Sequence, residues 1–333
     1  MLKDIIFNKL TKDGQSAEDY LAGVLGEPYV GYRKKFKTAG VGAFRMPDFP
    51  LQLDFQLNNR CNYRCPMCFW SEPRKLQDWS YPSTEFPFNK FCSIVRQGRE
   101  KGNLKVINFE GLNEPLLKND LVKYISFAKD AGVVDLTLHT NGLLLDKKWA
   151  ARLVKSGLTQ LMISLDAFSR ETYYKVRRSK KYDTVVRNIS SFLEIRAKMK
   201  AKLPLLRLSF VVQPSNIQER KDFVKYWKKY ADYILIQELI DMTKIANENE
   251  YRPSKGKFCP QPFYRMSIKA NGEVFPCCCS LGHIYLSSGN VFKDKISVLW
   301  KGELFERIRR MIKDGKYHEI PACKICFDNI FST

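Results

Sequence analysis

The cysteines are the residues of this 333-residue chain that say most about chemistry, because most of the ten are clustered. Cys61, Cys65 and Cys68 form a C-x3-C-x2-C motif, and Cys92 stands apart. Six more lie near the C-terminus: Cys259, Cys277, Cys278, Cys279, Cys323 and Cys326. The first residues show no secretory signal, so we expect a cytoplasmic protein with reduced thiols. Clustered thiolates in a reducing compartment predict soft-metal ligation rather than disulfides.

The C-x3-C-x2-C motif supplies three thiolates, one fewer than the four irons of a cubane cluster require. One iron would keep an open position, as a catalytic metal site does for its substrate. A zinc site that takes its fourth ligand from elsewhere is the alternative. We therefore expect a catalytic iron–sulfur cluster at Cys61, Cys65 and Cys68.

Strand and helix signals alternate from residue 51 onward and form the frame for this motif. Strands are expected at residues 51–56, 106–109, 134–138, 160–165, 206–212 and 233–236. Helices are expected at about residues 87–101, 120–131, 147–156, 184–200 and 217–230. This alternation predicts a parallel sheet with crossover helices, and six strands make an open, partial (β/α)6 barrel. Ligands gather at the carboxyl ends of such strands, where the motif falls.

Three segments are expected along the chain. Residues 1–50 form an N-terminal extension with short helices, residues 51–240 form the barrel, and residues 241–333 form a small α+β domain. Residues 241–258 read as a linker. Beyond it, an Asn-Gly turn predicts a hairpin of residues 264–268 and 273–275, followed by a helix at about 298–312.

The motif and the barrel together resemble the radical S-adenosylmethionine (SAM) superfamily over residues 51 to about 240. Residues 110–115 (EGLNEP) look like its Gly-Gly-Glu-Pro motif with a departure at LN, and residues 140–142 (TNG) resemble its Thr-Asn-Gly turn. Residues 164–167 (SLDA) are similar to its Ser-(Ile/Leu)-Asp-Gly segment, with Ala for Gly. In that superfamily SAM binds the open iron, and a 5′-deoxyadenosyl radical removes hydrogen from an unactivated C–H bond.

The resemblance implies a set of SAM contacts. Glu114, or the backbone beside it, would meet the amino group, and Arg177 would meet the carboxylate, with Arg178 or a solvated helix charge as alternatives. The remaining expected contacts are the backbone of Met67 and the side chains of Asn141, Ser164, Asp166 and Gln213, with Asn216 beside Gln213.

The C-terminal cysteines resemble a SPASM domain in its shortened Twitch form. Cys259 and Cys277 fit the Cys-x9–15-Gly-x4-Cys opening through Gly272, and Cys323 and Cys326 supply a Cys-x2-Cys pair. This implies one fully ligated auxiliary [4Fe–4S] cluster, the second of the chain. A four-cysteine zinc site is the alternative.

Three reaction types fit this resemblance. A dehydrogenase, as in 2-deoxy-scyllo-inosamine dehydrogenase, would oxidise a secondary alcohol and pass an electron to the auxiliary cluster. An epimerase would need a thiol hydrogen donor, for which Cys92, Cys278 and Cys279 are weak candidates; the apolar stripe around Cys92 favours simple packing. Peptide maturation is the third type, although residues 1–50 are short for a winged-helix recognition module. We favour oxidation of a sugar, aminocyclitol or nucleotide-sugar type of substrate.

The charge balance bears on partners. Lys and Arg number 56 against 35 Asp and Glu, a net charge of +21 that is spread over several clusters. This mildly favours an anionic substrate, but a solvated basic surface explains it as well. Nucleic acid is not expected, because no RNA-binding motif accompanies the charge. We expect a flavodoxin- or ferredoxin-type reductant, and no membrane span, because no run approaches roughly 20 apolar residues.

Overall fold

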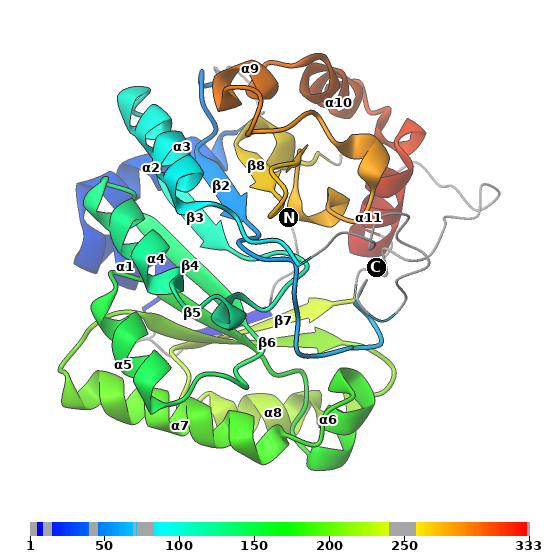
Figure 1. The fold of residues 1–333 in the computed structure, drawn as a ribbon. Coiled ribbons are helices and arrows are strands. Elements are labelled where there is room, and N and C mark those ends of the chain that lie inside the picture. The colour runs from blue at the N-terminus through cyan, green and yellow to red at the C-terminus, as the bar shows by residue number, and fades with distance from the viewer. Residues whose placement is uncertain are drawn as a thin grey trace.

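The structure is a computed structural model that describes residues 5–8, 15–39, 46–68, 71, 83–239 and 258–331. One nine-stranded sheet, in the order β1-β7-β6-β5-β4-β3-β2-β8-β9, runs through these residues (Figure 1). Its centre is six parallel strands: β2 (Gln52–Phe55), β3 (Val106–Phe109), β4 (Asp135–Thr140), β5 (Gln160–Ser164), β6 (Leu205–Val212) and β7 (Tyr233–Glu238). The predicted six-stranded open barrel is therefore confirmed.

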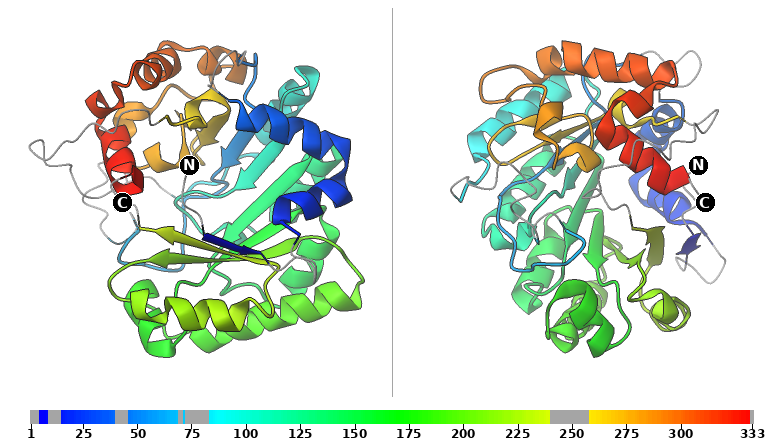
Figure 2. Two further views of the ribbon diagram at one scale, coloured as in Figure 1. Left: turned by 180° about the vertical axis from the view of Figure 1, so that it is seen from behind. Right: turned by 90° about the vertical axis from the view of Figure 1, so that its right-hand side faces the viewer.

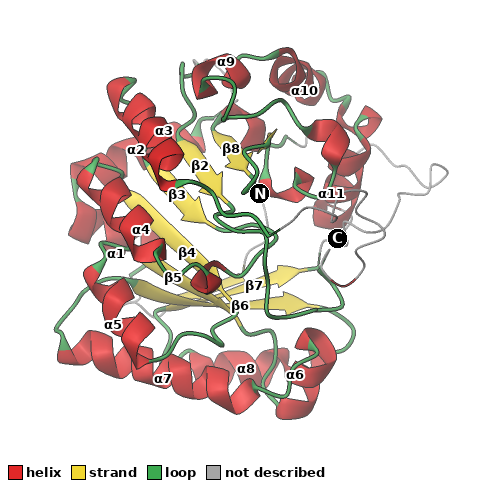
Figure 3. Cartoon of the chain, viewed as in Figure 1, coloured by secondary structure: helices red, strands yellow, loops and turns green. Residues whose placement is uncertain are grey.

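Helices form the outer layer around these strands (Figure 3). They are α3 (Phe88–Glu100), α4 (Leu121–Asp130), α5 (Lys147–Lys155), α7 (Tyr182–Lys198) and α8 (Arg220–Trp227), close to the predicted ranges. An additional helix, α6 (Arg170–Arg177), was not predicted. It begins at Ser169, whose side chain accepts a hydrogen bond from the Thr172 N–H and so caps the first turn.

The two faces of the strands differ in polarity. Leu53, Ile107 and Leu206 point to one face of the sheet, where they are buried in the main core beneath the outer helices. The alternate side chains, which include Asp54 and Arg207, point to the concave side, because successive side chains of a strand alternate between faces. The concave side is called the lumen below.

The N-terminal residues complete the barrel at one end. β1 (Ile5–Asn8) pairs antiparallel with β7, and α1 (Ala17–Leu25) and α2 (Glu27–Lys37) lie beside the strands, as the view from behind shows (Figure 2). Tyr29 and Tyr32 of α2 pack with side chains at the amino ends of β3, β6 and β7. The expected short helices are present, and the strand is an addition to the prediction.

The C-terminal residues extend the same sheet. β8 (Arg265–Ile268) pairs in parallel with β2, and β9 (Val274–Phe275) completes the predicted hairpin. The single helix expected at 298–312 is wrong: α9 (Ile296–Trp300) and α10 (Glu303–Lys313) are separate, because Gly302 adopts an extended conformation at the start of α10. α11 (Pro321–Phe331) follows.

Two further expectations concern the domain boundary and a membrane span. The predicted boundary near residue 240 and nearly all of the expected linker lie outside the described residues, so the division into domains stays a prediction. Within the described helices, none is long and apolar enough to cross a membrane.

Candidate functional site

The first cysteine motif lies in the loop after β2, at the carboxyl end of the barrel strands. Cys65 is buried, and Cys61 and Cys68 are partly buried. The Tyr63 N–H points to Cys61 Sγ at 3.5 Å, and the Cys68 N–H donates to the Cys65 carbonyl at 3.0 Å. Burial, with smaller contributions from the neighbouring Glu114 and thiols, raises the pKa of Cys61 to about 12. A bound metal would favour the thiolate form of Cys61.

Glu114 holds two of the predicted segments together. Its buried carboxylate accepts hydrogen bonds from Thr140 Oγ1 at 2.6 Å, from the Asn141 N–H at 2.8 Å and from the Leu116 N–H at 3.0 Å. The Asn141 amide in turn donates to Asn62 Oδ1 in the cysteine loop at 2.7 Å. Burial raises the pKa of Glu114 and these donors oppose that shift. Glu114 thus fixes the Thr-Asn-Gly turn against the cysteine loop.

Arg177 connects the cysteine loop to the Ser-Leu-Asp-Ala segment. Its guanidinium pairs with Asp166, which is fully buried in a left-handed conformation (φ 58°), and Nη1 lies 3.5 Å from Cys65 Sγ. Asp166 also accepts a hydrogen bond from the Val211 N–H at 2.9 Å. The alternative of a solvated Arg177 is wrong, because α6 turns it inward; Arg178 is the exposed one.

Several buried polar atoms around these segments have no hydrogen-bond partner among the described residues. They are Gln56 Oε1, both polar atoms of the Asn113 side chain, Arg177 Nε and Gln213 Nε2. Buried polar groups in proteins are normally paired, so such a group of free donors and acceptors fits a polar ligand such as SAM. Ser164 ends β5 on the same rim, and Met67 lies partly buried in the cysteine loop.

The C-terminal thiols converge on a second site. Cys323 and Cys326 lie three residues apart on α11, and Cys277 begins the short helix η7 (Cys278–Ser280). The Cys279 thiol contacts those of Cys277, Cys278 and Cys326, and it lowers the pKa of Cys277 while its own is raised. Cys259 and Cys323 lie close enough to influence these thiols electrostatically.

Six cysteines thus surround this auxiliary site, and the four predicted ligands are among them. No three His, Cys, Asp or Glu side chains in the described ranges enclose a single metal-ion position. The ligands of a cubane cluster need not do so, because each thiolate binds a different iron. The donor set therefore fits an iron–sulfur cluster.

None of the three thiols considered as hydrogen donors lies on a barrel strand. Cys92 is buried on α3 beside Arg96 and Lys123 in the outer helical layer, so its placement contradicts a role in the lumen. Cys278 and Cys279 lie at the auxiliary site. All ten cysteines are among the described residues, and none occupies a strand position that faces the lumen.

The prediction missed a charged network in the lumen. Arg265 of β8 forms salt bridges with Asp54 of β2 and with Glu110 just after β3. Glu110 Oε2 lies 3.1 Å from His139 Nδ1 on β4, and Ser267 Oγ donates to Asp54 at 2.7 Å. The signal in the sequence was polar residues at alternate positions of otherwise apolar strands, but only the strand register brings them together.

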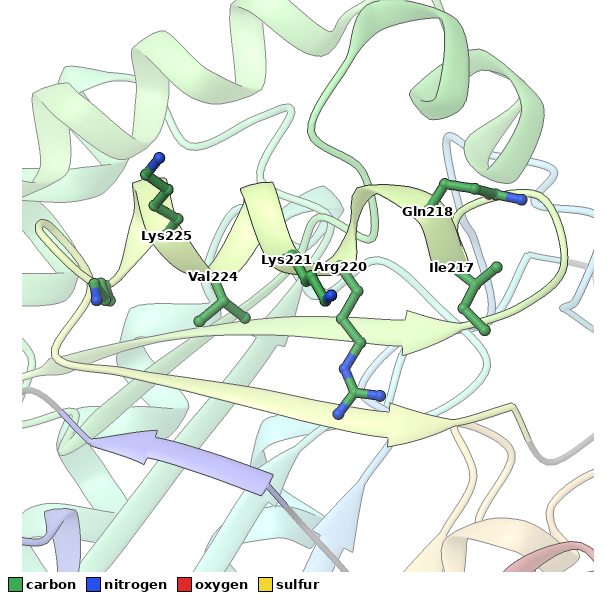
Figure 4. Close-up of a pocket in the computed structure, with 7 residues that line it drawn as sticks. Ile217, Gln218, Arg220, Lys221, Val224 and Lys225 are labelled. Atoms are coloured by element: carbon green, nitrogen blue, oxygen red, sulfur yellow. The ribbon is translucent and has the colours of Figure 1, made fainter.

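A separate groove of about 800 Å³ lies on the outer layer, along η4 (Ile217–Glu219) and α8 (Figure 4). Its lining is basic: Ile217, Gln218, Arg220, Lys221, Val224, Lys225 and Lys228. No cysteine and no predicted cofactor contact lines it, so this groove is distinct from the catalytic site. Glu219 of η4 nevertheless accepts the Phe168 N–H at 2.6 Å, which places one end of the groove beside the Asp166 segment.

Comparison with known families decides the identity of this arrangement. The sequence profile of the Radical SAM superfamily matches residues 55–234. The chain belongs to this superfamily. The profile of SPASM, an iron–sulfur cluster-binding domain, matches residues 259–327. This radical SAM enzyme therefore uses SAM and [4Fe–4S] clusters, as the sequence predicted.

Curated relatives of this radical SAM enzyme differ in activity. It is 23% identical over 318 residues to the tungsten-containing aldehyde ferredoxin oxidoreductase cofactor-modifying protein of Pyrococcus furiosus, covering 82% of this chain and 86% of that one. It is 31% identical over 210 residues to the GTP 3′,8-cyclase of Staphylococcus carnosus, covering 61% and 57%. The match to the cyclase thus spans less than two thirds of that relative.

Solved structures share its fold. BtrN, in complex with AdoMet and 2-DOIA, has a TM-score of 0.54 at 16% identity, covering 84% of this chain and 93% of BtrN. AdoMet-bound anSMEcpe has a TM-score of 0.61 at 17% identity, covering 85% and 92%. Streptococcus suis SuiB bound to S-adenosylmethionine has a TM-score of 0.60 at 17% identity, covering 84% and 72%. At these identities the likeness establishes the fold alone.

Proposed function

We propose that this radical SAM enzyme oxidises a secondary alcohol of a small polar substrate held in the barrel lumen. The observation that carries the proposal is the His139–Glu110 pair, joined through Arg265 to the strand that leads to the auxiliary site. Oxidation of an alcohol to a ketone removes a hydrogen atom, a proton and an electron. The lumen offers a proton acceptor, and Arg265 connects its partner Glu110 to the strand that leads to the auxiliary cluster site, the proposed electron acceptor.

We assign the cofactor-binding groups from the resemblance and from the contacts at the site. Cys61, Cys65 and Cys68 would hold the catalytic cluster, and Cys259, Cys277, Cys323 and Cys326 the auxiliary one. SAM would contact the backbone of Met67 and the side chains of Glu114, Asn141, Ser164, Asp166, Arg177 and Gln213. When bound, SAM and the catalytic cluster supply the radical chemistry that removes the hydrogen atom.

His139 is the proposed proton acceptor. Its Nδ1–H would donate to Glu110, which leaves the Nε2 lone pair free, and 27% of the side chain is exposed. Burial, with Arg207 and Arg265, lowers the pKa of His139 well below its usual value, so the imidazole is neutral near pH 7. After the proton moves to Nε2, the Glu110 carboxylate stabilises the imidazolium.

The placement of the cysteines supports oxidation over epimerisation. An epimerase that works through a thiol needs a cysteine beside the substrate radical. Cys92 lies in the outer layer, and Cys278 and Cys279 lie among the auxiliary thiols. The described lumen positions instead provide histidine, carboxylate and arginine groups.

The basic groove along η4 and α8 is the proposed docking surface for a flavodoxin- or ferredoxin-type reductant. Lys221, Lys225 and Lys228 are exposed there, and Ile217 is a half-exposed apolar contact. Electron carriers of these types are acidic, and complementary charge raises the rate of encounter. The end of the groove near Phe168 and Asp166 is the end nearer to the catalytic cluster loop.

The proposal is tested by anaerobic turnover with a panel of cyclitols, sugar phosphates and hydroxy acids. Oxidation gives a product lighter by two hydrogens, with one 5′-deoxyadenosine for each product. A product of unchanged mass that gains deuterium at carbon in heavy water would instead mean epimerisation. His139→Gln should lower product formation about 100-fold or more while 5′-deoxyadenosine still forms. His318→Gln, in the C-terminal region, is the control and should behave as wild type.

A further inference from the structure

The lumen has a closed floor. Asp135 accepts hydrogen bonds from Tyr32 Oη at 2.6 Å and from Gln160 Nε2 at 2.9 Å, and Tyr233 Oη donates to Gln160 Oε1 at 2.5 Å. Thr159 Oγ1 adds another hydrogen bond to Asp135 at 2.5 Å. The floor groups therefore satisfy one another and leave little for a substrate to bind.

The next layer is set by the register of the strands. His139 pairs with Met162, Met162 with Arg207, and Arg207 with Tyr233, so these side chains form one row across four strands. One pleat nearer to the carboxyl ends, Ser164 pairs with Ser209. Because Ser164 begins the segment proposed to contact SAM, Arg207 and His139 lie directly below that cofactor layer.

Arg207 differs from the other arginine of the lumen. Arg265 is engaged by two carboxylates, whereas none of the salt bridges among the described residues involves Arg207. The Arg207 guanidinium lies 5.6 Å from the centre of the Tyr233 ring, hydrogen-bonds to the Tyr233 side chain and contacts Met162 Sδ. Its Nε is buried without a hydrogen bond to any described residue. A guanidinium held in a partly buried site without a carboxylate is costly, unless a ligand supplies the negative charge.

We propose that Arg207 binds a carboxylate group of the substrate, beside His139 in the lumen. This inference rests on the proposed function and names its substrate class, a hydroxy acid or sugar acid. A planar guanidinium matches the two oxygens of a carboxylate. A phosphate dianion fits less well, because the carboxylates of Glu110 and Asp54 also face the lumen, and Arg207 is the one lumen guanidinium among the described residues that no carboxylate engages. With its carboxylate on Arg207, the substrate presents its hydroxyl carbon to His139 and to the cofactor layer above.

Equilibrium binding of simple probes tests this without turnover. Lactate and gluconate, each with a carboxylate and a hydroxyl, and inorganic phosphate are titrated into anaerobically prepared holoenzyme by calorimetry. We expect the two carboxylates to bind wild type and to bind Arg207→Gln at least about 10-fold more weakly, a change of about 1.4 kcal/mol. Arg207→Lys should recover part of the affinity. Arg187→Gln, on the exposed side of α7, is the matched control and should bind as wild type.

Three results would overturn the inference: carboxylate binding that is equal in Arg207→Gln, loss of binding that is equal in Arg187→Gln, or binding of phosphate in preference to both carboxylates at Arg207. Retained SAM affinity in each variant shows that the barrel is folded. The outcomes also separate the two proposals. Carboxylate binding at Arg207 without any alcohol oxidation rejects the proposed function alone, whereas oxidation of an uncharged alcohol that Arg207→Gln leaves unchanged rejects this inference alone.

Discussion

Asp166 and Arg177 show how single residues tie the cofactor segments together. Asp166→Asn would leave the Arg177 charge buried without its partner, which costs about 3–5 kcal/mol of the free energy of unfolding. The SAM dissociation constant should rise as well, because Arg177 also contacts Cys65. Chemical denaturation and equilibrium SAM binding measure the two effects. Asp183→Asn breaks a fully exposed ion pair with Arg170 and should change neither; equal effects in both variants would contradict a special role for Asp166.

His139 gives the protein a predictable response to pH. Its folded pKa is lowered by burial, Arg207 and Arg265, whereas an unfolded histidine titrates near ~6.5. Below about pH 6.5 this histidine binds a proton in the unfolded chain but not in the folded protein. The free energy of unfolding therefore falls as the pH decreases. Urea unfolding at pH 7.5 and 5.5 measures this loss. His139→Gln should lose less stability over that range than wild type, and an identical loss would mean that His139 titrates normally.

At the scale of elements, the sequence predicted what local patterns determine. Apolar strands with polar alternation placed β3 at its observed bounds and the other barrel strands within two residues. β1 escaped prediction because its stability comes from pairing with β7, far away in the chain. α6 escaped because its own pattern is polar, and it is held by its cap at Ser169 and by burial of Tyr173, Val176 and Arg177.

The candidate site divides in the same way. Thiols at short spacings predict a metal site, so both cysteine motifs could be recognised in the sequence. The lumen network was not, because Asp54, Glu110, His139 and Arg265 belong to four different places in the chain. Parallel pairing of β8 with β2 brings Arg265 to Asp54, and no local pattern predicts that pairing.

α2 holds the floor of the lumen through Tyr32, and a Tyr32→Phe variant tests this role. Tyr32 donates to the buried Asp135 carboxylate, and the loss of a hydrogen bond to such a group costs about 1.5–3 kcal/mol. We expect a decrease of this size in the free energy of unfolding, measured by denaturant titration. Tyr20→Phe on α1 removes a hydroxyl that makes no hydrogen bond to a described residue, and serves as the control. A neutral Tyr32→Phe variant would show that α2 does not hold the floor of the lumen.

The groove along η4 and α8 predicts a salt-dependent reaction with the reductant. Reversing Lys221 and Lys225 to Glu should slow reduction of the enzyme by flavodoxin about 10-fold at low salt, because charge complementarity speeds association. Reduction by dithionite, a small chemical reductant, should be unchanged. The control is the same charge reversal, Lys to Glu, at Lys147 and Lys148, which are exposed at the start of α5. If both double variants slow flavodoxin equally, the effect belongs to net charge and not to the groove.

At the scale of the whole molecule, the continuous sheet joins two regions that match separate families. β8 lies in the SPASM match and β2 is the first strand of the barrel, yet the two strands pair directly. Arg265 on β8 forms salt bridges with Asp54 on β2 and with Glu110 just after β3. Arg265 also lies close enough to Cys278 for their charges to interact. The Arg265 network therefore connects the lumen, where His139 lies on β4, with β8 and the auxiliary site that follows it.

The number of irons tests this two-site arrangement. Anaerobically reconstituted protein should hold about eight irons, and replacing Cys61, Cys65 and Cys68 with Ala should leave about four. Four irons with one zinc in the wild type would reject an auxiliary iron–sulfur cluster. Iron and zinc analysis together with electron paramagnetic resonance distinguish these cases.

The auxiliary thiols allow a finer test of the same site. Cys277 and Cys279 contact each other, but Gly272-x4-Cys277 spacing selects Cys277 as the ligand. Cys277→Ala should therefore lose the auxiliary cluster and retain about four irons, while Cys279→Ala retains about eight. The reverse result would make Cys279 the ligand. Its contacts with Cys278 and Cys326 give that outcome a physical basis, because the Cys279 thiol already lies among the others. Either result locates the cluster relative to Arg265, and so relative to His139, the proposed proton acceptor in the lumen.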